Sequence, residues 1–183
     1  MFEKTGKILR KRKRNTYQEY QNKYQQHIKK YKGIINLKGM IIAIGNDHAG
    51  VEVKETIQQH LEKKGHQVIN KGYDGEESVD YPDFIHPVSV DVKNKKAAIG
   101  VIVCGSGNGA AMTANKHEGI RAAICWSEEI ASLAKQHNNA NIISIPSRFL
   151  KEKEVLKIID VFIEKEFEGG RHERRIKKID KND

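Results

Sequence analysis

Cysteine is scarce in this sequence, and long apolar runs are absent. The 183 residues include two cysteines, Cys104 and Cys125, which cannot build a disulfide framework and which fit a reducing compartment. The longest apolar runs, such as Ile99–Cys104, are far shorter than the roughly 18–20 residues that span a membrane. No apolar segment typical of a secretory signal follows the basic cluster near the first residue. We therefore expect a cytoplasmic protein with no membrane partner.

Several common cofactor motifs are also missing. Neither cysteine lies in a C-x-x-C pair, and no histidines have the H-x-x-x-H spacing of a zinc site, so we expect no metal. The glycine-rich segment Gly105–Gly109 is not followed by the Gly-Lys-Ser/Thr of a P-loop. The first apolar run ends in Gly45–His48, which lacks the G-x-G-x-x-G of a dinucleotide-binding site. These absences argue against a zinc protein, a P-loop nucleoside triphosphatase and a protein with the usual dinucleotide-binding motif.

Positive charge is concentrated in the first fifth of the chain. Residues 1–39 hold 12 of the 33 Lys and Arg but only two of the 24 Asp and Glu, whereas residues 40–183 hold 21 basic and 22 acidic residues. The excess positive charge behind the net +9 therefore lies in this extension, and the rest of the chain is close to neutral. Basic residues with interleaved tyrosines would suit a nucleic-acid-binding arm, but charge runs are usually solvated tails. We predict a flexible or partly helical extension over 1–39, with nucleic-acid binding as the disfavoured alternative, and one domain over 40–183.

From Met40 onward, short apolar runs alternate with amphipathic segments. The runs are rich in β-branched residues and continuously apolar, which is typical of parallel strands buried on both faces. Expected strands cover 40–44, 66–69, 98–104, 121–126 and 141–145, and expected helices cover 51–64, 81–96, 110–117, 128–137, 149–166 and 171–179. This alternation predicts a single Rossmann-like, three-layer α/β domain, with a five-stranded parallel sheet and helices on both faces. In such sheets, ligands bind at the carboxyl ends of the strands.

The segment Val103–Gly109 carries the strongest local signal. A glycine-rich turn between a strand and a helix directs backbone N–H groups toward an anion. Cys104 is either a buried core cysteine or a reactive residue whose thiolate is favoured by the helix N-terminus. Asp47-His48 form a polar pair at the end of the first strand, suited to a sugar hydroxyl or a phosphate. Arg171 and Arg175 lie four residues apart on the last helix, where they form a phosphate clamp or part of a solvated basic helix.

Taken in order, the polar motifs of the chain match those of a known family. They are Asn46–Gly50, Asp80–Pro82, Cys104–Gly109, Ala114–Lys116, Gly119–Ala122, His137-Asn138, Ser147-Arg148 and Gly169–Arg175. In this order and spacing they closely resemble ribose-5-phosphate isomerase type B, of the family that also holds the galactose-6-phosphate isomerase subunits. The resemblance covers Met40 to about Ile179.

The resemblance implies an isomerase that interconverts D-ribose 5-phosphate and D-ribulose 5-phosphate through an ene-diolate, without metal or organic cofactor, as in the pentose phosphate pathway. It implies that Cys104 is the base, that His137 is the acid that opens the furanose ring, and that Ser106 and Asp47 assist near the reacting oxygens. It also implies that the glycine loop holds the ene-diolate oxygen and that the arginines hold the phosphate. The implied substrate-binding residues are Asp47, His48, Tyr81, Gly105, Ser106, Gly107, Asn108, Gly109, Asn138, Arg148, Arg171 and Arg175.

The resemblance also implies assembly and leaves one substrate question open. Family members are homodimers or homotetramers whose sites draw residues from two subunits, so we expect an isolated monomer to be inactive. A six-carbon aldose 6-phosphate of the allose or galactose type stays the alternative substrate, although Cys104 and Gly169–Arg175 in one chain favour the ribose enzyme. A branch of the family uses a glutamate where Ala110 stands, which leaves Cys104 as the candidate base. Asn46 and Ala140 also depart from the usual pattern, but neither position carries a proton.

Overall fold

The computed structural model describes residues 39–179 of the chain. From Met40 onward these residues belong to one compact unit. The predicted basic extension over residues 1–39 lies outside the described residues, apart from Gly39. Its flexible or partly helical structure, its boundary with the domain, and the alternative that it binds nucleic acid therefore stay predictions.

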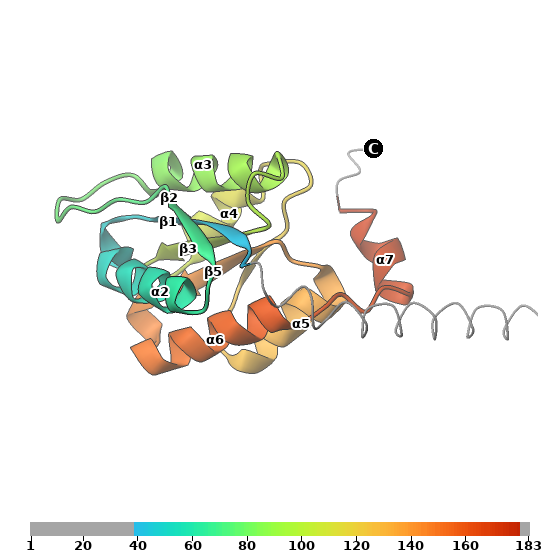
Figure 1. The fold of residues 1–183 in the computed structure, drawn as a ribbon. Helices are drawn as coiled ribbons and strands as arrows, with labels where there is room; N and C mark the ends of the chain where they lie inside the picture. The colour runs from blue at the N-terminus through green and yellow to red at the C-terminus, as the bar shows by residue number, and fades with distance from the viewer. Residues whose placement is uncertain (1–38, 180–183) are drawn as a thin grey trace, which may run out of the picture. The chain divides into compact units, whose positions relative to one another are not determined.

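Five parallel strands form the sheet (Figure 1). They are β1 (Ile41–Asn46), β2 (Gln67–Asn70), β3 (Ile99–Cys104), β4 (Ala122–Ile124) and β5 (Ile142–Pro146), in the spatial order β2-β1-β3-β5-β4. All six residues of β3 are buried, as its continuous apolar run predicts. Asn46 pairs with Val103, and Cys104 pairs with Pro146. The carboxyl ends of β1, β3 and β5 therefore meet at one edge of the sheet.

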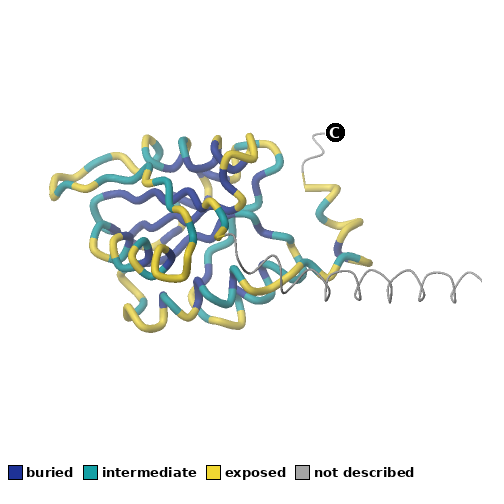
Figure 2. Tube along the Cα trace, viewed as in Figure 1, coloured by how far each residue is buried: buried dark blue, intermediate teal, exposed yellow. Residues whose placement is uncertain are grey.

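Helices cover both faces of this sheet. Figure 1 shows α3 (Tyr81–Lys93) and α4 (Asn108–Ala114) on one side, with α2 (Val51–Lys63), α5 (Glu128–Asn138) and α6 (Glu152–Glu164) on the other. Alternate side chains of a strand point to opposite faces. In β3, Ile102 packs in the core beneath α3 and α4, whereas Val101 and Val103 pack in the core shared with the other three helices. Figure 2 shows the buried strands between partly exposed helices, and the predicted three-layer fold is confirmed.

The predicted start of the long helix near the C-terminus is wrong. The prediction began it at Phe149, but α6 begins at Glu152. The carboxylate of Glu154 accepts the backbone N–H of Lys151 at 2.8 Å, which caps the helix at this point. The residues just before it, Ser147–Phe149, form the short 3-10 turn η2 instead.

Other boundaries also differ from the prediction, among them the ends of α3 at Lys93 and of α4 at Ala114, each three residues earlier than expected. α4 begins at Asn108 rather than Ala110, because the loop before it turns into the helix two residues earlier. β4 ends at Ile124, so Cys125 lies beyond this strand and not in its middle. The last helix, α7 (Arg171–Ile176), is three residues shorter than expected.

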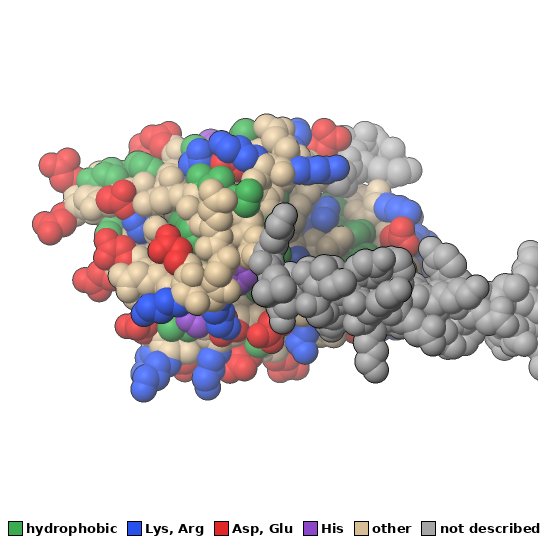
Figure 3. Space-filling model, in the orientation of Figure 1, with side chains coloured by type: hydrophobic (Ala, Val, Ile, Leu, Met, Phe, Trp, Pro, Cys, Tyr) green, Lys and Arg blue, Asp and Glu red, His purple; other side chains and the backbone are tan. Residues whose placement is uncertain are grey.

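The balanced charge of residues 40–183 is visible on the surface. On the face drawn in Figure 3, Lys and Arg side chains lie among Asp and Glu. A polyanion-binding surface gathers positive charge along one stripe or patch, and this face shows no such stripe. Within the described residues, no helix combines the length and apolar character needed to cross a membrane.

Candidate active site

Cys104 ends β3 in direct contact with the residue that follows β1. Its Sγ donates a hydrogen bond to Oδ2 of Asp47 at 3.0 Å, and the two residues are 8% and 4% exposed. The second carboxylate oxygen of Asp47 accepts the backbone N–H of Ala49 at 3.0 Å, at the start of the 3-10 turn η1 (His48–Gly50). The orientation of Asp47 is therefore held through both oxygens. Sequence reasoning placed both side chains at strand ends but missed this contact.

The surroundings of Cys104 raise the pKa of its thiol. Burial is the largest cause, and the Asp47 carboxylate adds to it as a hydrogen-bond acceptor and as a negative charge. Backbone N–H groups of Gly107 and Ser106 act in the opposite direction, which is the effect expected from a helix start. Burial and Asp47 outweigh them. Of the two alternatives that the sequence left open for Cys104, this direction of the pKa fits a buried thiol better than a thiolate favoured by the helix start.

Alkylation of Cys104 by iodoacetamide is expected to have its midpoint above the ordinary thiol pKa of about 8.5. In an Asp47→Asn variant the midpoint should move to lower pH, because the neighbouring negative charge is gone. Peptide mass spectrometry across a pH series measures both midpoints. Cys125, whose burial raises its pKa to about 12, is the slow-reacting comparison within the same chain. A midpoint at or below the ordinary value, or one that Asp47→Asn leaves in place, would contradict this account.

The loop Gly105–Gly109 lies beside the sulfur and turns the chain into α4. Gly107 has a φ of +74°, in the left-handed region that favours glycine. Ser144, which is fully buried on β5, donates its hydroxyl hydrogen to the Gly107 carbonyl oxygen at 2.8 Å and so fixes the turn. The exposed Ser106 accepts the backbone N–H of Asn108 at 3.4 Å. The sequence did not indicate this role of Ser144, because a serine among apolar neighbours predicts only a buried strand.

Two larger side chains flank this loop. The Tyr81 ring, at the start of α3, packs so closely on Gly109 that an added Cβ would lie 2.6 Å from the ring. The Arg148 guanidinium lies over Gly105, where an added Cβ would meet its Nε at 3.2 Å. The backbone N–H of Arg148 also donates to the Gly105 carbonyl oxygen at 3.1 Å. Both side chains therefore border the space in front of the loop.

His48 lies at the same edge of the sheet. Its Nδ1 accepts the backbone N–H of Val79 at 3.2 Å, from the loop between β2 and α3. The hydroxyl of Ser147 lies 2.8 Å from the Ala49 carbonyl oxygen and 3.2 Å from that of Cys104, which ties η1, β3 and η2 together. We name the predicted residues gathered here the Cys104 half-site: Asp47, His48, Tyr81, Cys104, Gly105, Ser106, Gly107, Asn108, Gly109 and Arg148.

His137 and Asn138 lie at the opposite edge of the sheet from Cys104. They end α5, a few residues before the start of β5. Ile142 pairs with Gly100 near the beginning of β3, and Pro146 pairs with Cys104 at the end of β3. At roughly 3.3 Å per residue, this stretch of β5 spans about 13 Å. The length of the strand therefore separates this pair from the Cys104 half-site of the same chain.

Arg171 and Arg175 lie on the same side as His137. Both are exposed on α7, whose buried His172 stacks on the His137 ring with centroids 4.2 Å apart and planes 5° from parallel. We name the second predicted group the His137 half-site: His137, Asn138, Arg171 and Arg175. One chain therefore keeps these two arginines together on α7 but does not bring them to Arg148.

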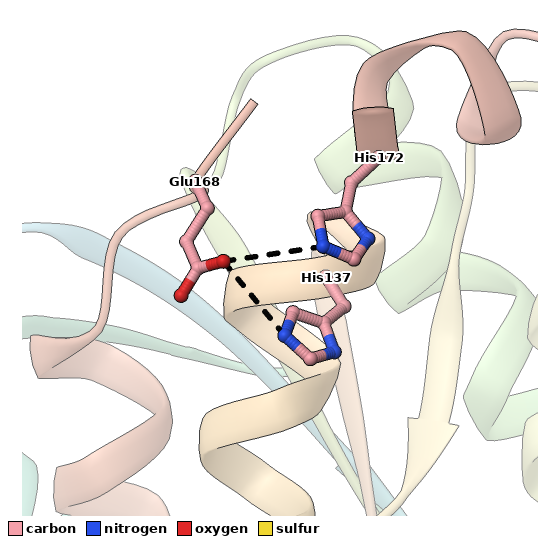
Figure 4. A group of neighbouring side chains, drawn as sticks. All are labelled: His137, Glu168 and His172. Carbon is pink, nitrogen blue, oxygen red and sulfur yellow. Dashed lines mark ion pairs between the residues drawn. The ribbon is translucent and has the colours of Figure 1, made fainter. Parts of the chain in front are cut away.

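A carboxylate that sequence reasoning did not single out joins this second group. Oε2 of Glu168 lies 3.8 Å from Nε2 of His137 and 3.9 Å from Nε2 of His172 (Figure 4). The pKa of His172 is lowered, by desolvation first and then by the positive charge of His137 and the nearby arginines, while Glu168 opposes the shift. No short motif spacing links positions 137, 168 and 172, so the sequence alone offered no signal for this cluster.

The same three side chains have the donor types of a metal site. Their nitrogen and oxygen ligand atoms lie within 4.8 Å of one another, and two histidines with a carboxylate can hold zinc. However, Nε2 of His172 accepts a hydrogen bond from Nε of Arg171 at 3.4 Å. This guanidinium would repel a metal ion at the same nitrogen. We therefore still predict that these three side chains bind no metal.

Comparison with known proteins identifies the family. The family described as Ribose/Galactose Isomerase matches residues 42–179, which is most of the chain. The chain belongs to this family. The resemblance drawn from the polar motifs of the sequence is thereby confirmed.

Similar proteins in the ribose/galactose isomerase family share both sequence and fold with this chain. A probable ribose-5-phosphate isomerase B of Mycoplasma genitalium is 44% identical over 142 residues, which cover 75% of this chain and 92% of the relative. The structure of a ribose 5-phosphate isomerase from Thermotoga maritima is 45% identical with a TM-score of 0.76, covering 77% of this chain and 97% of that one. The M. genitalium enzyme with bound ribulose-5-phosphate is 43% identical with a TM-score of 0.74, covering 78% and 95%.

Proposed function

We propose that this family member interconverts D-ribose 5-phosphate and D-ribulose 5-phosphate at sites shared between two copies of the chain. The observation that carries the reaction is the M. genitalium relative, 43% identical, whose structure holds ribulose-5-phosphate. The groups that this chemistry needs are present here: a thiol, an N–H-lined loop, an imidazole and several guanidiniums. The chain is an aldose–ketose isomerase, as the sequence predicted.

Two features support a shared site. The Cys104 and His137 half-sites lie at opposite edges of one sheet, which supports a site completed by a second copy of the chain. Met112 and Trp126 are 66% and 58% exposed and line a groove with Ile124 along α4 and the edge strand β4. Exposed apolar side chains that gather in this way mark protein interfaces. We infer a homodimer, or a homotetramer built from two such dimers.

The proposed reaction begins with ring opening and ends with proton transfer between two carbons. His137 of one copy donates a proton to the ring oxygen, the bond between C1 and that oxygen breaks, and the C1 hydroxyl gives its proton to water as the aldehyde forms. Cys104 of the other copy, as thiolate, takes the proton from C2 and returns it to C1, while the hydroxyl proton passes from O2 to O1. Backbone N–H groups of Gly105–Gly109 stabilise the ene-diolate oxygen in between. Because burial and Asp47 raise the pKa of Cys104, we expect kcat/KM to increase with pH.

Three arginines would hold the phosphate in this shared site. Arg148 comes from the copy that supplies Cys104, and Arg171 and Arg175 come from the copy that supplies His137. Guanidinium groups bind phosphate through charge-assisted and often paired hydrogen bonds. The proposed steps use only side chains and N–H groups of the protein, so we expect full activity in EDTA. Both cysteines are free thiols, which supports a cytoplasmic enzyme.

A coupled assay on the full chain tests the substrate. We expect turnover of ribose 5-phosphate, with kcat/KM at least about tenfold above that for allose or galactose 6-phosphate, because the bound relative carries a five-carbon sugar. Each sugar is assayed in both reaction directions and with EDTA. A preference for a six-carbon sugar would replace the proposed substrate, and the absence of any isomerisation would remove the proposed function.

A further inference from the structure

Glu168 is held against the end of α5 by its own backbone. Its N–H donates to the Gln136 carbonyl oxygen at 3.0 Å, one residue before His137. The side chain is half exposed, yet its Oε2 lies beside the Nε2 edges of the two stacked imidazoles, 3.8 Å from Nε2 of His137 and 3.9 Å from Nε2 of His172. In Figure 4 the other nitrogen of each ring points away from this carboxylate. One face of the His137 ring is covered by His172, and its Nε2 edge is occupied by Glu168.

Charge explains why a carboxylate is useful at this position. Two imidazoles stacked at 4.2 Å repel each other when both are protonated. Arg171 and Arg175 of α7 add positive charge beside His172, which disfavours a further positive charge on that ring. A negative carboxylate that contacts both rings offsets this repulsion. Without it, a protonated His137 would face cations and no counter-charge from this cluster.

We propose that Glu168 is a positioning residue that orients His137 and supplies the counter-charge for its role as the ring-opening acid. This inference rests on the proposed function. Glu168 acts through His137 and contributes nothing to proton transfer at C1 and C2. It therefore matters when the substrate is a closed ring and is dispensable when the substrate is already open.

The two substrates of the reaction separate these steps. Ribose 5-phosphate closes to a furanose through its C4 oxygen, so its conversion requires ring opening. Ribulose 5-phosphate cannot form a furanose, because its C5 oxygen carries the phosphate, and it is an open chain. Exchange of its C1 proton with D2O reports proton transfer by the base alone. Proton NMR follows this exchange and the conversion of ribose 5-phosphate in the same enzyme preparation.

Glu168→Gln keeps the shape of the side chain and removes its charge. We expect kcat with ribose 5-phosphate to fall about tenfold or more, as for a weakened general acid, while C1 exchange of ribulose 5-phosphate stays within about twofold of the wild type. The matched control is Glu173→Gln on α7, where the carboxylate pairs with Lys177 at the surface. This control is expected to leave both rates unchanged.

Each outcome separates the inference from a simpler role. Equal losses in both rates would mean that Glu168 only docks α7 with its phosphate-binding arginines, and this would overturn the inference. Unchanged rates would overturn it as well. If the wild-type chain neither converts ribose 5-phosphate nor exchanges the C1 proton, the proposed function fails first. Selective loss of the ring-opening reaction supports the assignment of Glu168.

Discussion

Substitution of Cys104 by alanine is expected to lower kcat/KM for ribose 5-phosphate by about 1,000-fold or more. The Cys104 sulfur lies where β3 ends and the loop N–H groups begin, and in the proposed reaction it is the atom that moves a proton between C1 and C2. Alanine leaves no atom there that can carry a proton. The residue lies at the end of its strand, so we expect the fold to survive. A coupled assay of ketose formation measures the loss.

The other buried thiol provides the matched control for this experiment. Cys125 is fully buried and its pKa is raised to about 12 by burial alone, which suits a core residue. Cys125→Ala should therefore lower the melting temperature and leave kcat/KM close to the wild type. Exchange of the ribulose 5-phosphate C1 proton should be lost in Cys104→Ala and retained in Cys125→Ala. Retained exchange in Cys104→Ala would show that another group carries the proton.

The layered fold was predictable because each element has a local cause. The run Ile99–Cys104 is apolar at nearly every position, which suits a central parallel strand with a helix layer on each face. Gly65 and Pro82 mark a helix end and a helix beginning: α2 ends just before Gly65, and Pro82 lies in the first turn of α3. The predicted boundaries failed where a side chain decides the cap. Glu154 starts α6 three residues later than the apolar pattern suggests, and such a contact is not visible in a periodicity.

The candidate site was predictable in its parts but not in its arrangement. Topology brings the ends of β1 and β3 together, so Asp47 and Cys104 could be placed at one edge from the sequence. Their direct hydrogen bond, which adds to burial in raising the pKa of the thiol, depends on side-chain orientation that no motif encodes. Glu168 and His172 were missed for a related reason. They reach His137 only because a loop folds back onto the last turn of α5.

The arrangement in two half-sites leads to the second large effect, which is rescue between two inactive variants. In the proposed shared site, Cys104→Ala removes the base, and an Arg171→Ala/Arg175→Ala variant removes two phosphate ligands, each of which would contribute a charge-assisted hydrogen bond. We expect each variant alone to retain less than about 1% of the wild-type activity. Co-expression with two different tags and tandem purification yields hybrid dimers. These hybrids should have about half of the wild-type activity per dimer.

The expected fraction follows from the symmetry of a dimer with two shared sites. In the hybrid, one site combines the Cys104 of one copy with the arginines of the other and is intact, while the second site carries both defects. If each chain held a complete site instead, every hybrid would contain one site without Cys104 and one without the arginines, and no activity would return. A matched control pairs Cys104→Ala with Arg148→Ala, two changes in the same half-site. That hybrid has one defect in each site and is expected to stay inactive, which separates true complementation from a general effect of mixing.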